Sequence, residues 1–372
     1  MNSRTIFKIK DSVDLFLSNE KYIIVYFMNS RQRKSFRVND DMLRLFELID
    51  GEKDVQTLQS IMHDDFEINP ECTSSILTAL LRSKIITEVV KEQNILPDNL
   101  VRRYSRQINY FSEFLEGEIE GIKAQKKLMD THILVFGCGA IGGNIAMELA
   151  MAGIGHISLY DYDIVDESDI SRHIFYRDQY LGQPKVKALE AELKAVNSEI
   201  QVVTYNDSMK PTSDIEKIIE TADFIVNTLD EPYIGYTASK ISRICVKHKK
   251  PHFIAGGFDA HLSSTGELII PYVTPCVECY ADHFKVALEG WKPKKHPVKS
   301  RYTEIGGLAS ASLFSSSYAC IEILKYIAGL TKMEEDYKIR GEFLFHDMSL
   351  TYLDVSKNPH CPVCGGVFGN ET

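Results

Sequence analysis

Two cysteine pairs have a spacing that indicates metal chemistry. Cys276 and Cys279 form one C-x₂-C motif, and Cys361 and Cys364 form a second, with 81 residues between the pairs. Each pair can present two thiolates from a tight turn, and two pairs complete the tetrahedral four-cysteine shell that zinc prefers. Four protein ligands leave no coordination position for water. The spacing therefore predicts a structural zinc that ties the C-terminal tail to its domain.

A glycine-rich segment indicates a phosphate site. The apolar run HILVF leads into a loop that contains Gly137, Gly139, Ala140 and Gly142, and an apolar helix is expected from about Ile141. Glycines permit a tight turn and a close approach of backbone amides to phosphate, and a helix N-terminus attracts negative charge. Asp161 ends the next apolar run, about where a carboxylate binds a ribose hydroxyl. We therefore expect these residues to bind a nucleotide.

The residues after Asp161 favour ATP over a dinucleotide. The polar segment DYDIVDESDISRH contains Asp163, a further nucleotide-binding candidate, and Arg172, and Lys185 follows in GQPKVKA. A triphosphate needs such cations, whereas a dinucleotide does not. Asp230 ends the run DFIVNTLD, where a carboxylate can hold Mg²⁺ against phosphate oxygens. We expect ATP and Mg²⁺ as cofactors; an NAD-dependent oxidoreductase is a distant alternative.

These residues need a sheet that brings the ends of several strands together. From His132 onward, buried β-type runs alternate with helical patterns, such as that from Lys185 to Asn197. This alternation predicts a Rossmann-like α/β domain with a mostly parallel sheet and helices on both faces. We place this domain at residues 95–372, after a polar linker that contains Pro97.

Residues 1–94 are predicted to form a separate, winged-helix-like α+β module. Short alternating runs at 13–38 predict an antiparallel meander, and helices are expected at 40–50, 54–64 and 71–83, before the strand-like IITEVV. Residues 1–90 carry 12 Lys and Arg against 14 Asp and Glu, a net charge of −2. This balance disfavours binding to a nucleic-acid backbone.

Composition excludes several other classes. The chain has 372 residues, 44% of them hydrophobic and 25% charged, which is ordinary for a globular protein with two or more cores. Neither a signal peptide nor a run of about 20 apolar residues is present, so we expect a cytoplasmic protein without a membrane partner. The net charge of −10 argues against a nucleic-acid partner.

In this order the motifs resemble the ubiquitin-activating-enzyme-like superfamily, which includes the ThiF- and MoeB-type adenylating enzymes of thiamine and molybdenum-cofactor biosynthesis. The resemblance runs from about residue 101, with the motif Arg103-Tyr-Ser-Arg106-Gln107, to residue 366. It implies ATP-dependent formation of an acyl-adenylate, usually by a homodimer. The roles it implies are Asp161 at the ribose, Arg172 and Lys185 at the phosphates, Asp230 at Mg²⁺, and Arg106 in the neighbouring subunit's site.

Two departures from the superfamily pattern matter. Asp169 stands where relatives often have an asparagine that contacts nucleotide, which makes its role in binding doubtful. No cysteine lies between Tyr280 and Ala319, where thioester-forming relatives place a nucleophile, so a covalent thioester is disfavoured.

The N-terminal module is similar to the PqqD-like leader-peptide recognition domains of peptide-antibiotic maturases, which capture a leader as an added strand. The whole layout resembles peptide-adenylating maturases of the microcin and pantocin type. We therefore expect adenylation of a carboxylate in a ribosomally synthesised precursor peptide, leading to cyclisation or another modification in antibiotic biosynthesis. Adenylation of a ubiquitin-like sulfur-carrier protein and a non-catalytic peptide- or DNA-binding regulator remain alternatives.

A basic segment leaves two interpretations open. Between Ala281 and Arg301 only two residues are acidic, whereas six are basic: Lys285, Lys292, Lys294, Lys295, Lys299 and Arg301. Such a run is usually a solvated loop. It could also steer an acidic core peptide toward ATP, in which case a Glu or Asp side chain would be activated.

Overall fold

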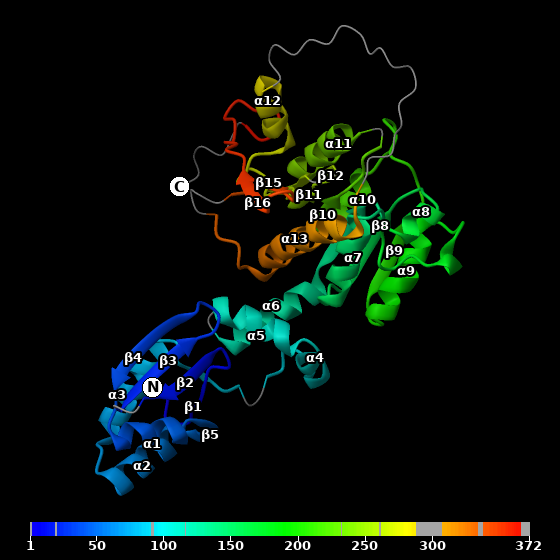
Figure 1. The fold of residues 1–372 in the computed structure, drawn as a ribbon. Coiled ribbons are helices and arrows are strands. Elements are labelled where there is room, and N and C mark those ends of the chain that lie inside the picture. Colours follow the sequence, from blue (N-terminus) through cyan, green and yellow to red (C-terminus); the bar gives the residue numbers. More distant parts are fainter. Residues whose placement is uncertain are drawn as a thin grey trace. The chain divides into compact units, whose positions relative to one another are not determined.

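The computed structural model describes residues 2–18, 21–90, 93–115, 117–231, 233–259, 262–287, 307–333 and 338–365. The chain divides into two compact units, Met1–Lys123 and Ala124–Thr372 (Figure 1). Helices α4 (Asp98–Arg103) and α5 (Ser105–Phe114) group with the first unit, and α6 (Glu118–Asp130) spans the division. The boundary expected near residue 95 stays a prediction about independent folding.

The N-terminal unit contains two small antiparallel sheets. The predicted meander is formed by β2 (Val13–Leu17), β3 (Tyr22–Phe27) and β4 (Gln32–Arg37). The sequence did not predict the second sheet, in which β1 (Ile6–Ile9) lies between β5 (Asp50–Asp54) and β6 (Ile86–Glu88). The segment DGEKD of β5 has no apolar side chain, so its pairing with β1 depends on main-chain hydrogen bonds.

Three helices follow the meander, as predicted. They are α1 (Asp40–Leu48), α2 (Val55–Phe66) and α3 (Pro70–Arg82). Each begins after a side chain that accepts a hydrogen bond from a backbone amide of the first turn, supplied by Asn39, Asp54 and Asn69. Val25, Leu45, Leu58 and Leu77 are fully buried in one core. The small α+β module is therefore confirmed.

The C-terminal unit is built on a six-stranded sheet in the order β14-β11-β10-β7-β8-β9. Its strands are β7 (His132–Phe136), β8 (His156–Tyr160), β9 (Gln201–Tyr205), β10 (Phe224–Asn227), β11 (His252–Ile254) and β14 (Glu267–Ile269). Strands β7 to β11 are parallel, and β14 runs antiparallel to β11. The predicted mostly parallel sheet is confirmed.

Helices cover both faces of this sheet (Figure 1). On one face, Leu134 and Phe136 of β7 share a core with Ile219 and Ile241 of α10 (Glu216–Thr221) and α11 (Ile234–Lys247). The other face is covered by α7 (Gly142–Met151), α9 (Lys185–Val196) and α13 (Ala309–Ala328). Buried apolar residues on both sides of the central strands β7 and β10 explain the continuous apolar runs in the sequence.

A second sheet completes this unit. It consists of β12 (Phe258–Asp259), β13 (Leu262–Ser264), β15 (Gly341–Leu344) and β16 (Ser349–Tyr352), all antiparallel. Two short helices, α8 (Glu167–Ile170) and α12 (Val277–Ala287), lie in the connections that carry the acidic segment and the first cysteine pair. Among the described helices, none has both the length and the apolar content needed to span a bilayer.

Candidate nucleotide and metal sites

The sheet order places a topological switch point beside β7. The chain runs from β7 through β8 to β9 on one side, and β10 and β11 then lie on the other side of β7. In open α/β sheets, ligands bind at such a reversal, outside the carboxyl ends of the strands. The glycine loop follows β7, Asp161 follows β8, and Asp230 lies beyond β10. The structure therefore brings these three predicted elements to one edge.

The glycines of the loop have different structural reasons. Gly137 has a φ of +95°, and a Cβ there would lie 2.2 Å from Thr228 Oγ1. A Cβ on Gly142 would lie 2.1 Å from the Gly137 carbonyl oxygen. In contrast, a Cβ on Gly139 would meet no atom within 4 Å. Packing within the protein thus requires Gly137 and Gly142, whereas the space beside Gly139 is open to a ligand.

This contrast gives a matched pair of variants. Gly139→Ala should keep the wild-type melting temperature and weaken binding of a non-hydrolysable ATP analogue at least about tenfold, or about 1.4 kcal/mol. The reason is that the new methyl group would occupy space next to phosphate. Gly142→Ala should lower the melting temperature instead. Calorimetric titration and thermal unfolding measure the two effects, and wild-type affinity in Gly139→Ala would contradict the placement of phosphate.

Asp161 is held against the glycine loop. Asp161 is 5% exposed, and its Oδ2 accepts a hydrogen bond from the Cys138 amide at 2.6 Å. Its Oδ1 accepts one from the Asp163 amide at 2.8 Å. Burial raises the pKa of Asp161, against the lowering effect of these two hydrogen bonds. A carboxylate has about four lone-pair positions, so acceptor capacity remains, and ribose binding stays a prediction.

The predicted phosphate-binding cations meet around Asp169. Lys185 is the first residue of α9, and its Nζ lies 3.3 Å from both Asp163 Oδ2 and Asp169 Oδ2. Arg172 Nη2 lies 3.3 Å from Asp169 Oδ1. Burial lowers the pKa of Lys185, but Asp169, Asp163 and Asp161 outweigh it, and the pKa is raised overall. Lys185 therefore carries a positive charge at neutral pH.

Asp230 is exposed in the loop after β10. This loop is anchored to β7 by Thr228, whose Oγ1 donates a hydrogen bond to the Phe136 carbonyl at 2.9 Å. It is also tied to the loop after β8, because the Tyr162 hydroxyl donates a hydrogen bond to Glu231. The glycine loop follows β7, which lies between β8 and β10 in the sheet. Asp230 is thus fixed near the switch point with its carboxylate open to solvent.

Sequence reasoning missed Tyr176. Its hydroxyl, buried with the rest of the residue, donates hydrogen bonds to the Cys138 carbonyl at 2.9 Å and the Lys185 carbonyl at 3.3 Å. Tyr176 therefore links the glycine loop to the start of α9. A buried tyrosine looks like any core aromatic in a sequence, and only its place four residues after Arg172 could have drawn attention to it.

Several predicted residues remain untested. Arg106 is exposed on α5, in the N-terminal unit, and its role in a neighbouring subunit stays a prediction, as does the homodimer. Residues 288–306, which contain five of the six basic residues between Ala281 and Arg301, lie outside the described residues. The sixth, Lys285, is exposed on α12 and pairs with Asp282 at 3.0 Å.

The four predicted metal ligands come together. All four Sγ atoms lie within 4.8 Å of one another, and all four cysteines are buried. The Cys276 and Cys361 Sγ atoms are 3.6 Å apart, and those of Cys279 and Cys364 are 3.5 Å apart. A tetrahedral zinc with Zn–S bonds of about 2.3 Å requires S···S distances of about 3.8 Å. The cluster fits zinc, and its separations are too long for disulfides, which are about 2.05 Å.

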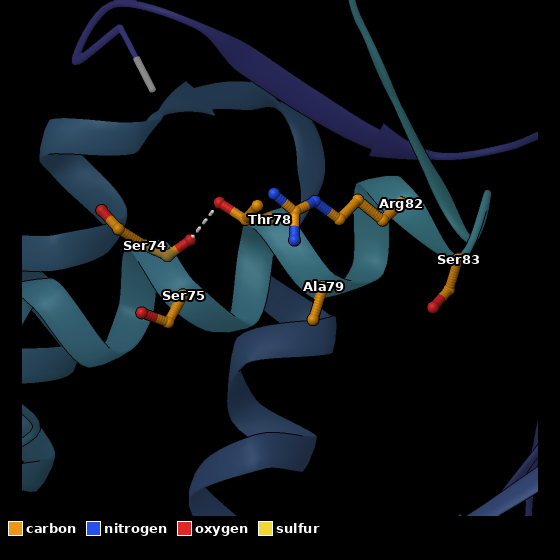
Figure 2. A pocket seen from close by; sticks show the side chains of 6 residues that line it. All are labelled: Ser74, Ser75, Thr78, Ala79, Arg82 and Ser83. Atoms are coloured by element: carbon orange, nitrogen blue, oxygen red, sulfur yellow. Dashed lines mark hydrogen bonds between the residues drawn. The ribbon is translucent and has the colours of Figure 1, made fainter.

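The N-terminal unit has a surface pocket of its own, along one face of α3 (Figure 2). Its volume is about 530 Å³, and it is lined by Ser74, Ser75, Thr78, Ala79, Arg82 and Ser83. The Thr78 hydroxyl donates a hydrogen bond to the Ser74 carbonyl at 2.8 Å, so part of this polar lining is already paired within the helix. A single cation in the lining differs from the basic face of a DNA-binding helix.

Comparison with known proteins identifies relatives of this arrangement. A family model described as the ThiF family matches residues 104–363. The chain is 29% identical over 286 residues to the adenylyltransferase and sulfurtransferase MOCS3-1 of Zea mays, covering 74% of this chain and 54% of the maize protein. It is 29% identical over 278 residues to the heterocyst protein HesA of Trichormus variabilis, covering 73% of this chain and 91% of HesA. The chain thus spans about half of the maize relative and most of HesA.

A solved structure matches more of the chain. The microcin C7 biosynthetic enzyme MccB, in complex with N-formylated MccA, has a TM-score of 0.73 at 20% identity. The match covers 96% of this chain and 99% of MccB, and MccB of E. coli also has a structure with ATP. At this identity the likeness shows a shared fold. Only 4% of this chain lies outside the match with MccB. The match therefore includes most of the residues that precede the ThiF match.

Proposed function

The chain belongs to the ThiF family of ATP-dependent adenylating enzymes, and we propose that its substrate is a carboxylate of a ribosomally synthesised precursor peptide. The observation that carries this proposal is the folded α+β module formed by β1 to β6 and α1 to α3, which lies ahead of the family match at 104–363. A module of this kind offers a sheet edge on which an enzyme could hold a peptide leader by strand addition. The shared fold with MccB, which has been crystallised with MccA, supports the same substrate class.

The proposed reaction joins a carboxylate oxygen to the α-phosphorus of ATP, and pyrophosphate leaves. In this proposal the amides beside Gly139 and the N-terminus of α7 bind phosphate, and Arg172 and Lys185 offset the charge of the leaving pyrophosphate. Asp161 would hold the ribose and Asp230 a Mg²⁺ ion, which supplies further positive charge to the phosphates. Exclusion of water would then preserve the acyl-adenylate until the next bond forms.

The free edge of β4 offers a place for a leader peptide. Among the described strands, β4 pairs with β3 alone. The Val38 amide donates a hydrogen bond to the Lys21 carbonyl of the chain leading into β3. Together with the register between β3 and β4, this bond implies that the backbone amide and carbonyl of Phe36 point toward β3. The amides of Arg33, Ser35 and Arg37 therefore point away from the sheet. An extended peptide could pair with them, and the basic side chains of this strand would favour an acidic leader.

Ser35→Pro tests this docking site in the full-length chain. Proline removes an outward-facing amide, which an edge strand tolerates, so the protein should fold but bind the precursor at least about tenfold more weakly, or about 1.4 kcal/mol. Ser35→Ala, which keeps the amide, is the matched control and should bind normally. Fluorescence anisotropy with a labelled precursor measures the affinity. Normal binding by folded Ser35→Pro would assign another role to this edge.

The sulfur-carrier alternative rests on the maize relative, whose name includes sulfurtransferase. Exchange of labelled pyrophosphate into ATP separates the two substrates. If a sulfur-carrier protein with a free C-terminus stimulates exchange and a precursor peptide encoded beside the gene does not, the alternative is favoured. Stimulation by the peptide alone supports the proposal.

A further inference from the structure

The buried carboxylate of Asp169 lies behind the two cations of the nucleotide site. Its side chain is 1% exposed, compared with 46% for Arg172 and 10% for Lys185. Oδ1 contacts Arg172, and Oδ2 contacts Lys185 and accepts a hydrogen bond from the Asp166 amide at 3.1 Å. A group so deeply buried cannot touch a ligand from solvent without a rearrangement. The two cations, in contrast, lie between Asp169 and the solvent.

Lys185 needs a fixed counter-ion at its position. It is the first residue of α9, a 12-residue helix, where the helix dipole is unfavourable for a positive charge. Burial adds a desolvation penalty for the ammonium group. Of its two carboxylate partners, Asp163 is 46% exposed and free to turn toward solvent or a ligand, whereas Asp169 is enclosed. The enclosed partner is the one able to fix the position of Nζ.

Asp169 is itself held rigidly. It occupies the third position of α8, where it forms a reciprocal capping box with Asp166. The ring of His173 lies close to Asp169 on its other side. Burial lowers the pKa of His173 to about 4, so this ring is neutral at neutral pH. The Asp169 carboxylate therefore has a fixed position, and this position determines where Lys185 and Arg172 can form their ion pairs with it.

From these contacts, and resting on the proposed function, we infer that Asp169 is a positioning residue that holds Lys185 and Arg172 in place for phosphate without contacting the nucleotide itself. The position that often carries a nucleotide-binding asparagine in relatives would then have a different task in this chain. The inference also has an electrostatic consequence. The four carboxylates Asp161, Asp163, Asp166 and Asp169 outnumber the cations Lys185 and Arg172, and Asp230 beyond β10 adds a further carboxylate, so this site carries an excess of negative charge.

Asp169→Asn separates these effects, since asparagine keeps the shape and the hydrogen-bond acceptor but removes the charge. In pyrophosphate exchange, kcat should fall roughly tenfold because the cations lose their anchor, in the range of coupling seen for contacting residues. The KM for ATP should fall about threefold because the site becomes less negative. A partly unfolded protein would lose kcat without improving KM, so this split is specific to the inferred role.

A double-variant cycle with Lys185→Met tests whether Asp169 acts through Lys185. In the Lys185→Met background, Asp169→Asn should cause a smaller loss of kcat than in the wild type, because only its contact with Arg172 is still there to lose. Asp207→Asn, which neutralises an exposed carboxylate after β9 and outside this cluster, is the matched control and should behave as wild type. Equal losses in both backgrounds, an unchanged Asp169→Asn, or a tenfold loss for Asp207→Asn would each overturn the inference. A wild-type protein that neither binds ATP nor catalyses exchange would instead refute the proposed function, and this role with it.

Discussion

Cys361→Ser is expected to release the metal from the C-terminal unit and to lower its melting temperature by at least about 10 °C. The four thiolates lie within a core that also contains Val246, Ile254 and Ile269. Structural zinc contributes about 10–16 kcal/mol of apparent binding energy in small zinc domains. About 5 kcal/mol of lost stability, well below that figure, would lower the melting temperature of a unit of this size by about 10–20 °C.

The physical reason is that a zinc ion bound by these four cysteines would close a long loop. The second cysteine pair is brought next to the first pair, at the start of α12, by the four-thiolate cluster. Among the described residues before the second pair, the Lys357 Nζ donates a hydrogen bond to the Tyr272 carbonyl, and the Asn358 amide lies 3.5 Å from Cys279 Sγ. Without the metal, four thiolates crowded in an apolar core would repel one another or protonate. The tail should then detach, and the apolar residues around it should become exposed.

Elemental analysis and calorimetry check this prediction. Purified wild-type protein should contain one zinc per chain, and Cys361→Ser should contain none. Cys72→Ser is the matched control, because Cys72 is an exposed cysteine on α3, outside the cluster, and should keep both zinc and stability. A wild-type protein without metal, or a Cys361→Ser variant with an unchanged melting temperature, would contradict the structural role.

Much of the C-terminal unit could be predicted from the sequence because its signals are local. The run HILVF, the glycine loop and the following apolar helix form one strand–turn–helix unit, and the structure confirms its order with β7 and α7. The two C-x₂-C motifs likewise specify a four-thiolate cluster whatever the intervening chain does, and the cluster is found. In both cases the chemistry is encoded by residues close together in the sequence.

Other features depend on distant partners and left no readable signal. The strand β5 is entirely polar, and it forms only because β1 supplies main-chain partners some 45 residues away, with Ile6 opposite Asp54. Asp169 lies in a polar segment typical of a surface loop, yet it is buried because Lys185 and Arg172 compensate its charge. Burial of a charge is determined by its three-dimensional neighbours, which residue type and spacing do not reveal.

Asp230→Ala and Arg172→Ala are expected to fold normally and to lose carboxylate-dependent exchange of pyrophosphate into ATP by roughly 10²–10³-fold. The Asp230 side chain is exposed, and the Arg172 side chain is 46% exposed, so neither fills the core. In Arg172→Ala, Lys185 still pairs with the buried Asp169. Their proposed work is electrostatic: Asp230 would hold Mg²⁺, and Arg172 would stabilise charge that develops on the leaving phosphates. Removing one such group from a preorganised site typically costs about 3–4 kcal/mol of transition-state stabilisation.

Two matched variants make this experiment specific. Asp207→Ala removes an exposed carboxylate after β9, at the same edge of the sheet but two strands from the switch point. Arg177→Ala removes an arginine that pairs with Glu192 at 2.9 Å, away from Asp169. Both variants should retain pyrophosphate exchange within about twofold of the wild-type rate. Exposed charges that do not contact the site are screened by salt and contribute little to catalysis there. If Asp230→Ala and Arg172→Ala also retained wild-type exchange with unchanged melting temperatures, the carboxyl edge around β7 and β10 could not be the site of adenylation.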